Sequence, residues 1–326
     1  MNLNLTKIIF ITLMMFSTII SISSSNWLSM WMGLELNLFT FIPILNFKMS
    51  IYSIESTMKY FLIQAFASII LLMFLINKSL FFMIQINMMI IIPLLMKLSL
   101  MPFHLWLPSM IEGLNWMSCL LLMTWQKISP MIMISYLNLN KTIMFTIMMI
   151  SLNNLFGMNQ NSIRKILAMS SINNSSWMLI AIIMNEILWI NYFMIYTILN
   201  TMIIYILSMY NINYINQLKF FNFSFLFKLN MLMLIFSIMG LPPMQEYLMK
   251  WMLIKMLIYN KMIFILIMLI TLTILNLYFY LKMTYFLLFN FNLFNKWFFQ
   301  NKKNNNFNII LFMNFFSLFF SFMFFY

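Results

Sequence analysis

Four ionisable side chains lie in or beside long apolar stretches of this sequence, where a membrane would oppose their charge. They are Glu35, Lys97, Lys127 and Lys250. A charge at the centre of a membrane-spanning helix costs about 2.5–3.5 kcal/mol on scales from membrane-insertion experiments. Such residues persist where they face water, a partner group or a moving ion. The sequence therefore predicts that this chain handles charge, and most simply protons, inside a bilayer.

Glu35 lies near the middle of the apolar stretch 26–46, within the residues WMGLELN. A carboxylate at that depth must be paired, solvated or protonated. We predict a functional role, because ionisable residues within membrane spans mark ion pathways. The alternative is a neutral glutamic acid that is hydrogen-bonded to a neighbouring helix.

Lys97 and Lys127 are each followed within five residues by a proline, Pro102 and Pro130. A proline lacks the N–H that would bond the carbonyl four residues earlier, so each lysine lies next to an unbonded backbone acceptor. In lipid that acceptor must be satisfied by protein or water. Water beside a titratable amine is what a proton relay needs. The alternative is a lysine that extends to the membrane surface, but both lysines lie too near mid-span for that.

His104 follows Lys97 by seven residues, which is nearly the same helix face if the turn at Pro102 does not rotate it. Imidazole titrates near neutral pH, so His104 could pass protons between the lysines. It could equally be a polar residue of an aromatic belt at the membrane surface, together with Phe103 and Trp106.

Lys250 follows an expected helix break at Gly240, Pro242 and Pro243. Half-helix ends at such breaks expose backbone groups and commonly form ion sites at membrane depth. Glu246 comes one turn earlier, in the favourable Glu-before-Lys order. The carboxylate either tunes the protonation of Lys250 or merely neutralises its charge, and both interpretations stay open.

These residues must be held by membrane helices, because the chain is 64% hydrophobic and only 7% charged, against roughly 25% charged in soluble domains. The prediction is an all-α, polytopic membrane helix bundle that forms a single domain over 1–326. Apolar stretches long enough to cross about 30 Å of hydrocarbon indicate about eleven transmembrane helices. They are 3–24, 26–46, 54–77, 83–107, 112–137, 141–157, 161–184, 188–209, 226–259, 262–289 and 307–326. Two of them, 83–107 and 226–259, contain prolines and are expected to be broken.

The composition itself carries information. The chain has no Val and no Asp, only four Gly, four Ala and five Glu, but 40 Met. All the scarce types have codons that begin with G, which indicates an AT-rich gene, and so many Met residues suggest a mitochondrial code. Asn, Lys and Met are therefore common for reasons unrelated to function, whereas each Glu runs against the bias.

Several kinds of site are excluded. One cysteine, Cys119, and one histidine, His104, are too few for an iron–sulfur cluster, a haem or a structural zinc, and the scattered glycines form no phosphate loop. No cofactor, metal or nucleotide site is expected in this chain. The net charge of +13 is attributed to loops that meet anionic lipids, and no nucleic-acid partner is expected.

With eleven spans, the N-terminus and every second loop share one side of the membrane. That side carries most of the loop lysines and the single arginine, Arg164. The positive-inside rule then places the N-terminus in the matrix of a mitochondrion and the C-terminus in the intermembrane space.

Seven stretches, in order along most of the chain, closely resemble the NADH dehydrogenase subunit 2 family of animal, insect-like mitochondrial complex I. They are SNWLSMWMGLELN (25–37), STMKYFLIQAFAS (56–68), MKLSLMPFHLWLPSMIEG (96–113), LLLMTWQKISP (120–130), SIRKILAMSSI (162–172), GLPPMQEYLMKW (240–251) and LNLYFYLK (275–282). The combination of PFHLW, TWQK and GLPP is specific, although each alone would be weak.

The resemblance implies an antiporter-like subunit of the inner mitochondrial membrane that moves protons along buried charges and water. Glu35 matches the family's glutamate, Lys97 and Lys127 match its central lysines, and Lys250 matches the lysine of its second broken helix. Partners would be the other membrane-arm subunits, including the other antiporter-like ones. NAD, FMN, iron–sulfur clusters and ubiquinone would belong to other subunits.

The sequence departs from the family's usual pattern at two places. Where members usually read SSI-x-H-x-G-W, this chain has Asn174 and Ser176, so no role for that histidine carries over. Within the usual GLPP-x-x-GF-x-PKW it has Glu246, Tyr247 and Met249. The extra carboxylate beside the lysine makes this member's terminal proton site unusual.

The mechanism we expect is an electrostatic switch. At 4 Å and an effective dielectric constant of about 20, a pair of Glu35 and Lys97 gains roughly 4 kcal/mol. Separating the pair would release the proton of Lys97 toward Lys127. Two alternatives remain at this stage: a structural membrane subunit that pumps nothing, and a free-standing cation/proton antiporter.

Overall fold

The computed structural model describes residues 5–47, 50–80, 85–137, 160–220, 225–242 and 244–288. Within these ranges the chain forms helices and no strand, with one isolated bridge between Ser162 and Tyr214. The all-α class is therefore confirmed. The predicted spans 141–157 and 307–326 lie outside the described residues. The chain divides into two compact units, Met1–Ile150 and Ser151–Tyr326, and a single domain over 1–326 stays a prediction.

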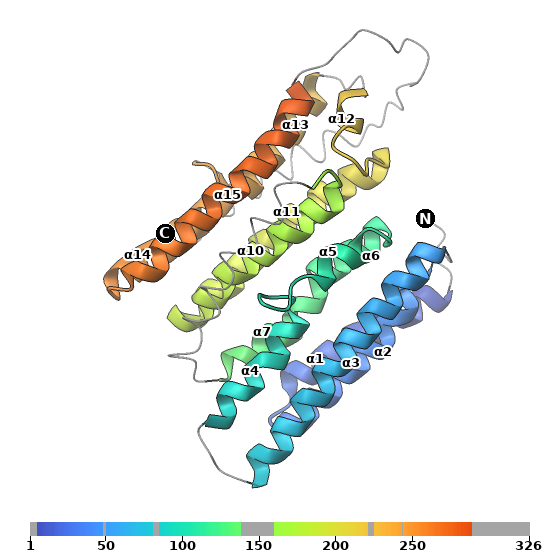
Figure 1. Ribbon diagram of the computed structural model, residues 1–326, viewed down its shortest axis with the longest axis vertical. Coiled ribbons are helices and arrows are strands. Elements are labelled where there is room, and N and C mark those ends of the chain that lie inside the picture. The colour runs from blue at the N-terminus through green and yellow to red at the C-terminus, as the bar shows by residue number, and fades with distance from the viewer. Residues whose placement is uncertain are drawn as a thin grey trace. The chain divides into compact units, whose positions relative to one another are not determined.

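The first unit begins with three long helices that match the first three predicted spans. They are α1 (Leu5–Ser23), α2 (Trp27–Leu45) and α3 (Ile51–Leu80). In Figure 1, α1 packs along α2, and α2 packs against α3. Gly33 allows the first of these contacts, because a Cβ atom at this position would lie 2.8 Å from Cβ of Ser21. The small residue thus brings α1 and α2 close together.

The remaining helices of this unit are short, because both of the predicted spans that they belong to are interrupted. They are α4 (Gln85–Lys97), α5 (Trp106–Ile111), α6 (Trp116–Met123), the 3₁₀ turn η1 (Trp125–Lys127) and α7 (Ile128–Ser135). The predicted break in 83–107 is confirmed, and it falls directly after Lys97. Pro93 lies inside α4 without ending it. The predicted span 112–137 is also interrupted, at η1, which the sequence prediction had not placed.

The second unit is built around one deeply buried helix. Its helices are α10 (Ile163–Met184), α11 (Glu186–Tyr210), α12 (Gln217–Phe220), α13 (Phe225–Met239), α14 (Gln245–Tyr259) and α15 (Ile263–Leu288). α10 contacts α11, α14 and α15, and all of its residues from Ile166 to Ile182 are buried. The predicted break within 226–259 is confirmed, since α13 ends at Met239 and α14 begins at Gln245.

Asparagines set both ends of α11. The side chain of Asn185 accepts a hydrogen bond from the N–H of Ile187 at 3.0 Å and so caps the first turn. Asn211 ends the helix in the left-handed conformation, with φ of 51°, a conformation that Asn tolerates better than most residues.

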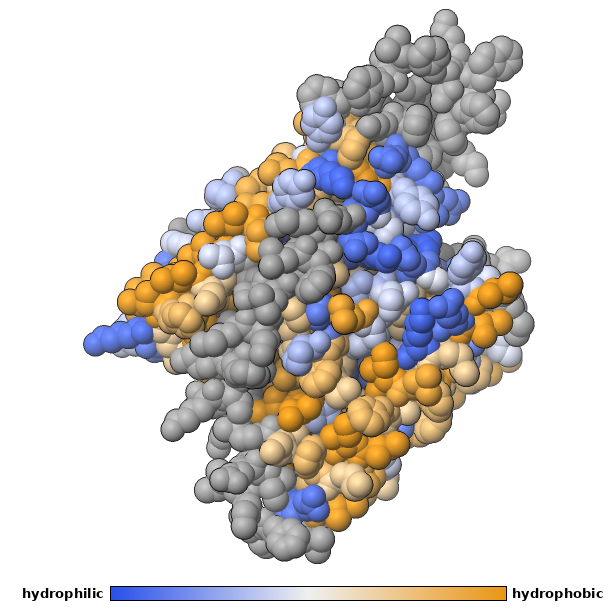
Figure 2. Space-filling model, viewed as in Figure 1, coloured by the Kyte–Doolittle hydropathy of each residue, from blue (hydrophilic) through white to orange (hydrophobic). Residues whose placement is uncertain are grey.

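Seven helical segments of the described part are long and apolar enough to cross a membrane, when Trp116–Ser135 (α6, η1 and α7) is taken as one. Large apolar side chains are exposed on several of them, such as Leu62 and Ile69 on α3 and Ile267 and Ile274 on α15. Figure 2 shows hydrophobic surface over the visible sides of α3 and α15. An apolar exterior of this kind suits lipid rather than water, so the chain is a multi-pass membrane protein.

Candidate functional site

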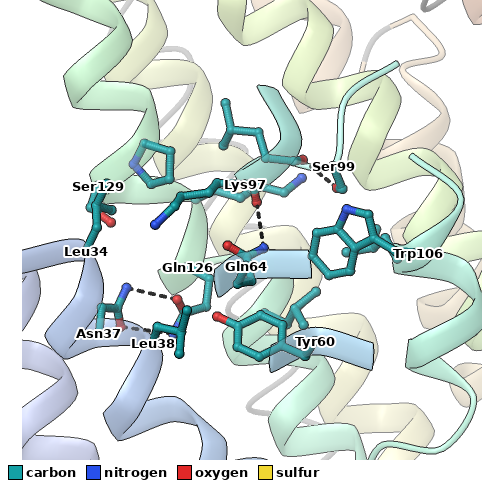
Figure 3. A pocket seen from close by; sticks show the side chains of 15 residues that line it. Leu34, Asn37, Leu38, Tyr60, Gln64, Lys97, Ser99, Trp106, Gln126 and Ser129 are labelled. Carbon is teal, nitrogen blue, oxygen red and sulfur yellow. Dashed lines mark hydrogen bonds between the residues drawn. The ribbon is translucent and has the colours of Figure 1, made fainter. Parts of the chain in front are cut away.

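A small cavity in the first unit is lined by polar side chains from five segments, α2, α3, α4, η1 and α7 (Figure 3). The volume in which the centre of a water molecule fits is about 20 Å³. A single water needs roughly 10–15 Å³ measured in this way, so the cavity is large enough for about one water. Its polar lining includes Asn37, Gln64, Lys97, Gln126, Lys127 and Ser129.

Both Lys97 and Lys127 line this cavity. Lys97 is the last residue of α4 and Lys127 is the last residue of η1. Their side chains are only 9% and 3% exposed. The two helix breaks therefore bring both lysines to the lining of one cavity, although the lysines are 30 residues apart in the sequence.

The backbone around the break after α4 is satisfied by protein side chains. The side-chain amide of Gln64, on α3, donates to the carbonyl of Lys97 at 3.4 Å, and the hydroxyl of Ser99 donates to the carbonyl of Leu98. Figure 3 shows both contacts at the edge of the cavity. The acceptor expected to be unbonded next to Pro102 thus has a protein donor, because Ser99 lies within its reach.

Two amides clamp α2 to the turn that carries Lys127. Asn37 Nδ2 donates to Gln126 Oε1 at 2.9 Å, and Gln126 Nε2 donates back to Asn37 Oδ1 at 3.1 Å, as Figure 3 shows. Asn37 lies two residues after Glu35, and Gln126 immediately precedes Lys127. The two hydrogen bonds therefore hold α2, which carries Glu35, against η1, which carries Lys127.

Glu35 lies on α2 beside the lining residue Leu34 and is half-buried. The ion pairs found within 4.0 Å among the described residues do not include Glu35. The pair of Glu35 and Lys97 that the sequence predicts is therefore not in direct contact in this structure.

The wall of the cavity also holds polar atoms suited to a water molecule. Ser129 Oγ and Trp106 Nε1 are buried and have no hydrogen-bond partner among the residues that the structure describes. Both residues line the cavity. A buried water typically makes about three hydrogen bonds, and these two groups and the amines together could supply them.

His104 does not line the cavity of the two lysines. Because α4 ends at Lys97, residues 98–105 continue outside a helix, so the two residues do not share a helix face. His104 is 3% exposed, and its carbonyl accepts from the N–H of Leu107 at 3.2 Å. Within the described ranges, no three His, Cys, Asp or Glu side chains gather in a way that could hold a metal.

The second unit holds the remaining predicted residues, on α14. Lys250 Nζ lies 3.1 Å from Glu246 Oε2, and these residues are 6% and 1% exposed. Gly240, with φ of 73°, lies beside them: a Cβ atom at this position would be 2.9 Å from Lys250 Nζ. Glycine at the break therefore accepts a left-handed backbone and leaves room for the amine.

Asn174 and Tyr192 extend this ion pair, and sequence reasoning missed their part in it. Asn174 Nδ2, on α10, donates to Glu246 Oε1 at 2.6 Å, and the hydroxyl of Tyr192, on α11, donates to Asn174 Oδ1 at 3.2 Å. The departure at position 174 was visible in the sequence. Its contact with Glu246 was not, because it depends on how two helices pack.

Comparison with known proteins gives a consistent answer. Residues 24–276 match the family described as "NADH:quinone oxidoreductase/Mrp antiporter, TM". The chain is 42% identical to NADH-ubiquinone oxidoreductase chain 2 of Anopheles gambiae, over 95% of this chain and 94% of the relative. It is 36% identical to the chain of the same name from Hylobates lar, over 88% of each. Among solved structures, it resembles a chain of respiratory complex I from Thermus thermophilus with a TM-score of 0.84, at 17% identity over 97% of this chain and 77% of that one, which shows a shared fold. The chain therefore belongs to the NADH-ubiquinone oxidoreductase chain 2 family.

Proposed function

We propose that this chain relays protons across the mitochondrial inner membrane through Glu35, Lys97, Lys127 and Lys250. As a member of its family, it is a subunit of the membrane arm of NADH:ubiquinone oxidoreductase, respiratory complex I, and other membrane-arm subunits are its partners. The observation that carries the proposal is the shared, water-sized cavity of Lys97 and Lys127. Water in this cavity would give the two lysines a path for a proton that does not cross hydrocarbon.

The relay begins with the distance between Glu35 and Lys97. When the carboxylate comes within about 4 Å, it stabilises the protonated amine by roughly 4 kcal/mol at an effective dielectric constant of 20. When it withdraws, desolvation favours release of the proton, and water in the cavity passes it to Lys127. Lys250 continues the route in the second unit.

The remaining parts of the proposal concern the surroundings of the chain. Electron transfer from NADH to ubiquinone, with the flavin and iron–sulfur clusters that it needs, would take place in other subunits and drive the movement of Glu35. The N-terminus would lie in the matrix and the C-terminus in the intermembrane space, with anionic lipids against the basic loops. The whole chain would act as one membrane domain.

Glu35→Gln should slow proton-coupled turnover of the assembled complex by about tenfold or more. A tenfold effect corresponds to 1.4 kcal/mol, well within the roughly 4 kcal/mol that the charge can supply. Assembly should be intact, because glutamine keeps the size of the side chain and Glu35 has no ion-pair contact within the described residues. The NADH:ubiquinone rate and the number of protons moved per electron, both in sealed vesicles, measure the effect.

Glu55→Gln is the matched control, since Glu55 is 58% exposed and forms a pair with Lys59 at the end of α3. It should leave rate and stoichiometry near those of the unmodified complex. If Glu35→Gln behaves like this control, the electrostatic switch is wrong.

A further inference from the structure

Four polar side chains form a buried hydrogen-bonded chain across three helices of the second unit. The hydroxyl of Tyr192 donates to Asn174 Oδ1, Asn174 Nδ2 donates to one oxygen of Glu246, and Lys250 Nζ donates to the other, at 3.2, 2.6 and 3.1 Å. All four residues are at most 6% exposed. Their groups meet each other rather than solvent, so the protonation of one constrains the others.

The contacts of Glu246 suit an ionised carboxylate. A side-chain NH₂ and an ammonium can only donate, so both oxygens of Glu246 accept a hydrogen bond, and such bonds are stronger to a carboxylate than to a carboxylic acid. The hydroxyl of Tyr192 bonds the oxygen of Asn174 and thereby turns its NH₂ toward Glu246. This arrangement is therefore self-consistent for a charged Glu246 beside a charged Lys250.

The contact between Glu246 and Lys250 is hard to break by moving helices. The two residues lie on the same helix, α14, at positions i and i+4, whose side chains remain neighbours as long as the helix persists. The contact between Glu246 and Asn174 is different, because Asn174 lies on α10. Movement of α10 relative to α14 can therefore change the Asn174 contact while the ion pair persists.

We propose that the side-chain amide of Asn174 is a two-position switch that follows the proton of the Glu246–Lys250 pair. In the second position, the ammonium of Lys250 gives one proton to the carboxylate of Glu246, which leaves a neutral amine and a carboxylic acid. The new O–H forms on Oε2, the oxygen that faces Lys250, so the carboxyl group rotates about its Cγ–Cδ bond and brings the O–H to the side of Asn174. The amide then turns over: the acid O–H donates to Asn174 Oδ1, and Asn174 Nδ2 donates to the hydroxyl oxygen of Tyr192. No atom or charge is lost, since the proton only changes its holder.

The consequence for a relay is specific. The pair has zero net charge in both positions, so neither position leaves an uncompensated charge in the buried interior, which would be costly. In the second position, however, the amine of Lys250 is neutral and can accept a proton from elsewhere. Asn174 and Tyr192 are thus positioning residues for Lys250. The role of the switch in a proton relay rests on the proposed function, whereas the two hydrogen-bonded positions do not.

The test is infrared difference spectroscopy of the assembled complex that carries Asn174→Leu. Leucine removes both the bond from Asn174 to the ionised carboxylate and the bond from the carboxylic acid to Asn174. The bond to the ionised form is roughly twice as strong, so the ratio of ionised to protonated Glu246 should fall by roughly tenfold, and the C=O stretching band of a buried carboxylic acid should grow. The same band should be absent from Asn174→Leu combined with Glu246→Gln.

Asn173→Leu is the matched control. Asn173 is the preceding residue of α10, is 1% exposed, and its side-chain amide has no hydrogen-bond partner within the described part of the chain. Its variant should leave the acid band unchanged. An Asn174→Leu complex that assembles and shows no additional band dependent on Glu246 overturns the switch. If the band appears but Glu35→Gln pumps normally, the switch stands and the proposed relay in the first unit fails.

Discussion

Replacing Lys97 by Met is expected to lower proton-coupled turnover of the assembled complex by roughly a hundredfold. A positioned side chain that transfers a proton contributes typically a factor of 10² or more, and Met has no group that can hold one. Met is also a flexible, unbranched side chain that fills apolar space, so the packing around the cavity should be kept. The rate of ubiquinone reduction, together with proton uptake by vesicles, measures the loss.

Lys59→Met separates this effect from a general effect of removing a lysine. Lys59 lies in the same unit, on α3, but its side chain is 42% exposed and its partner Glu55 is on the surface. Exposed pairs contribute about 0–1 kcal/mol, so the control should turn over normally. A Lys97→Met complex that keeps its rate and its stoichiometry would show that the amine serves only for assembly.

Lys250→Met is expected to destabilise the chain by about 3–5 kcal/mol, because it leaves the carboxylate of Glu246 buried without its charge partner. Glu246 is 1% exposed, so water cannot replace the ammonium. The double variant Glu246→Gln with Lys250→Met removes both charges and should recover most of the loss. The amount of assembled complex and its thermal denaturation midpoint measure both effects.

Lys255→Met is the control on the same helix. Its ammonium is exposed and lies over the ring of Trp251, a contact worth roughly 0.5–1 kcal/mol at exposed sites, so the loss should be small. Equal stability of Lys250→Met and the double variant would mean that Glu246 carries no charge once Lys250 is removed. The predicted cost of an unpaired buried carboxylate would then be wrong.

Much of the fold follows from the sequence, because lipid imposes simple requirements on it. Each predicted span within the described ranges has a helical counterpart, since long apolar runs leave few alternatives to helices in a membrane. The break between α13 and α14 was expected from Gly240 and the prolines that follow it. The turn η1 was not placed, because Pro130 marks a disturbance near Lys127 but does not say on which side the helix gives way.

The sequence predicted the charged residues of the site but not the asparagine and glutamine side chains that contact them. Glu35 stood out because glutamate runs against the composition of this chain. Asn37 and Asn174 did not, because asparagine is common here for reasons of codon usage. The contacts of these residues also join segments far apart in sequence, 89 residues for Asn37 and Gln126. Two departures from the family pattern, Asn174 and Glu246, in fact contact each other, which no spacing in the sequence indicates.

The most direct measurement is a density map of the assembled complex at a resolution that shows individual water molecules. The account predicts ordered water in the cavity lined by Lys97 and Lys127, within hydrogen-bonding distance of both amines. A map in which apolar side chains fill that cavity, so that nothing polar joins the two amines, would contradict it.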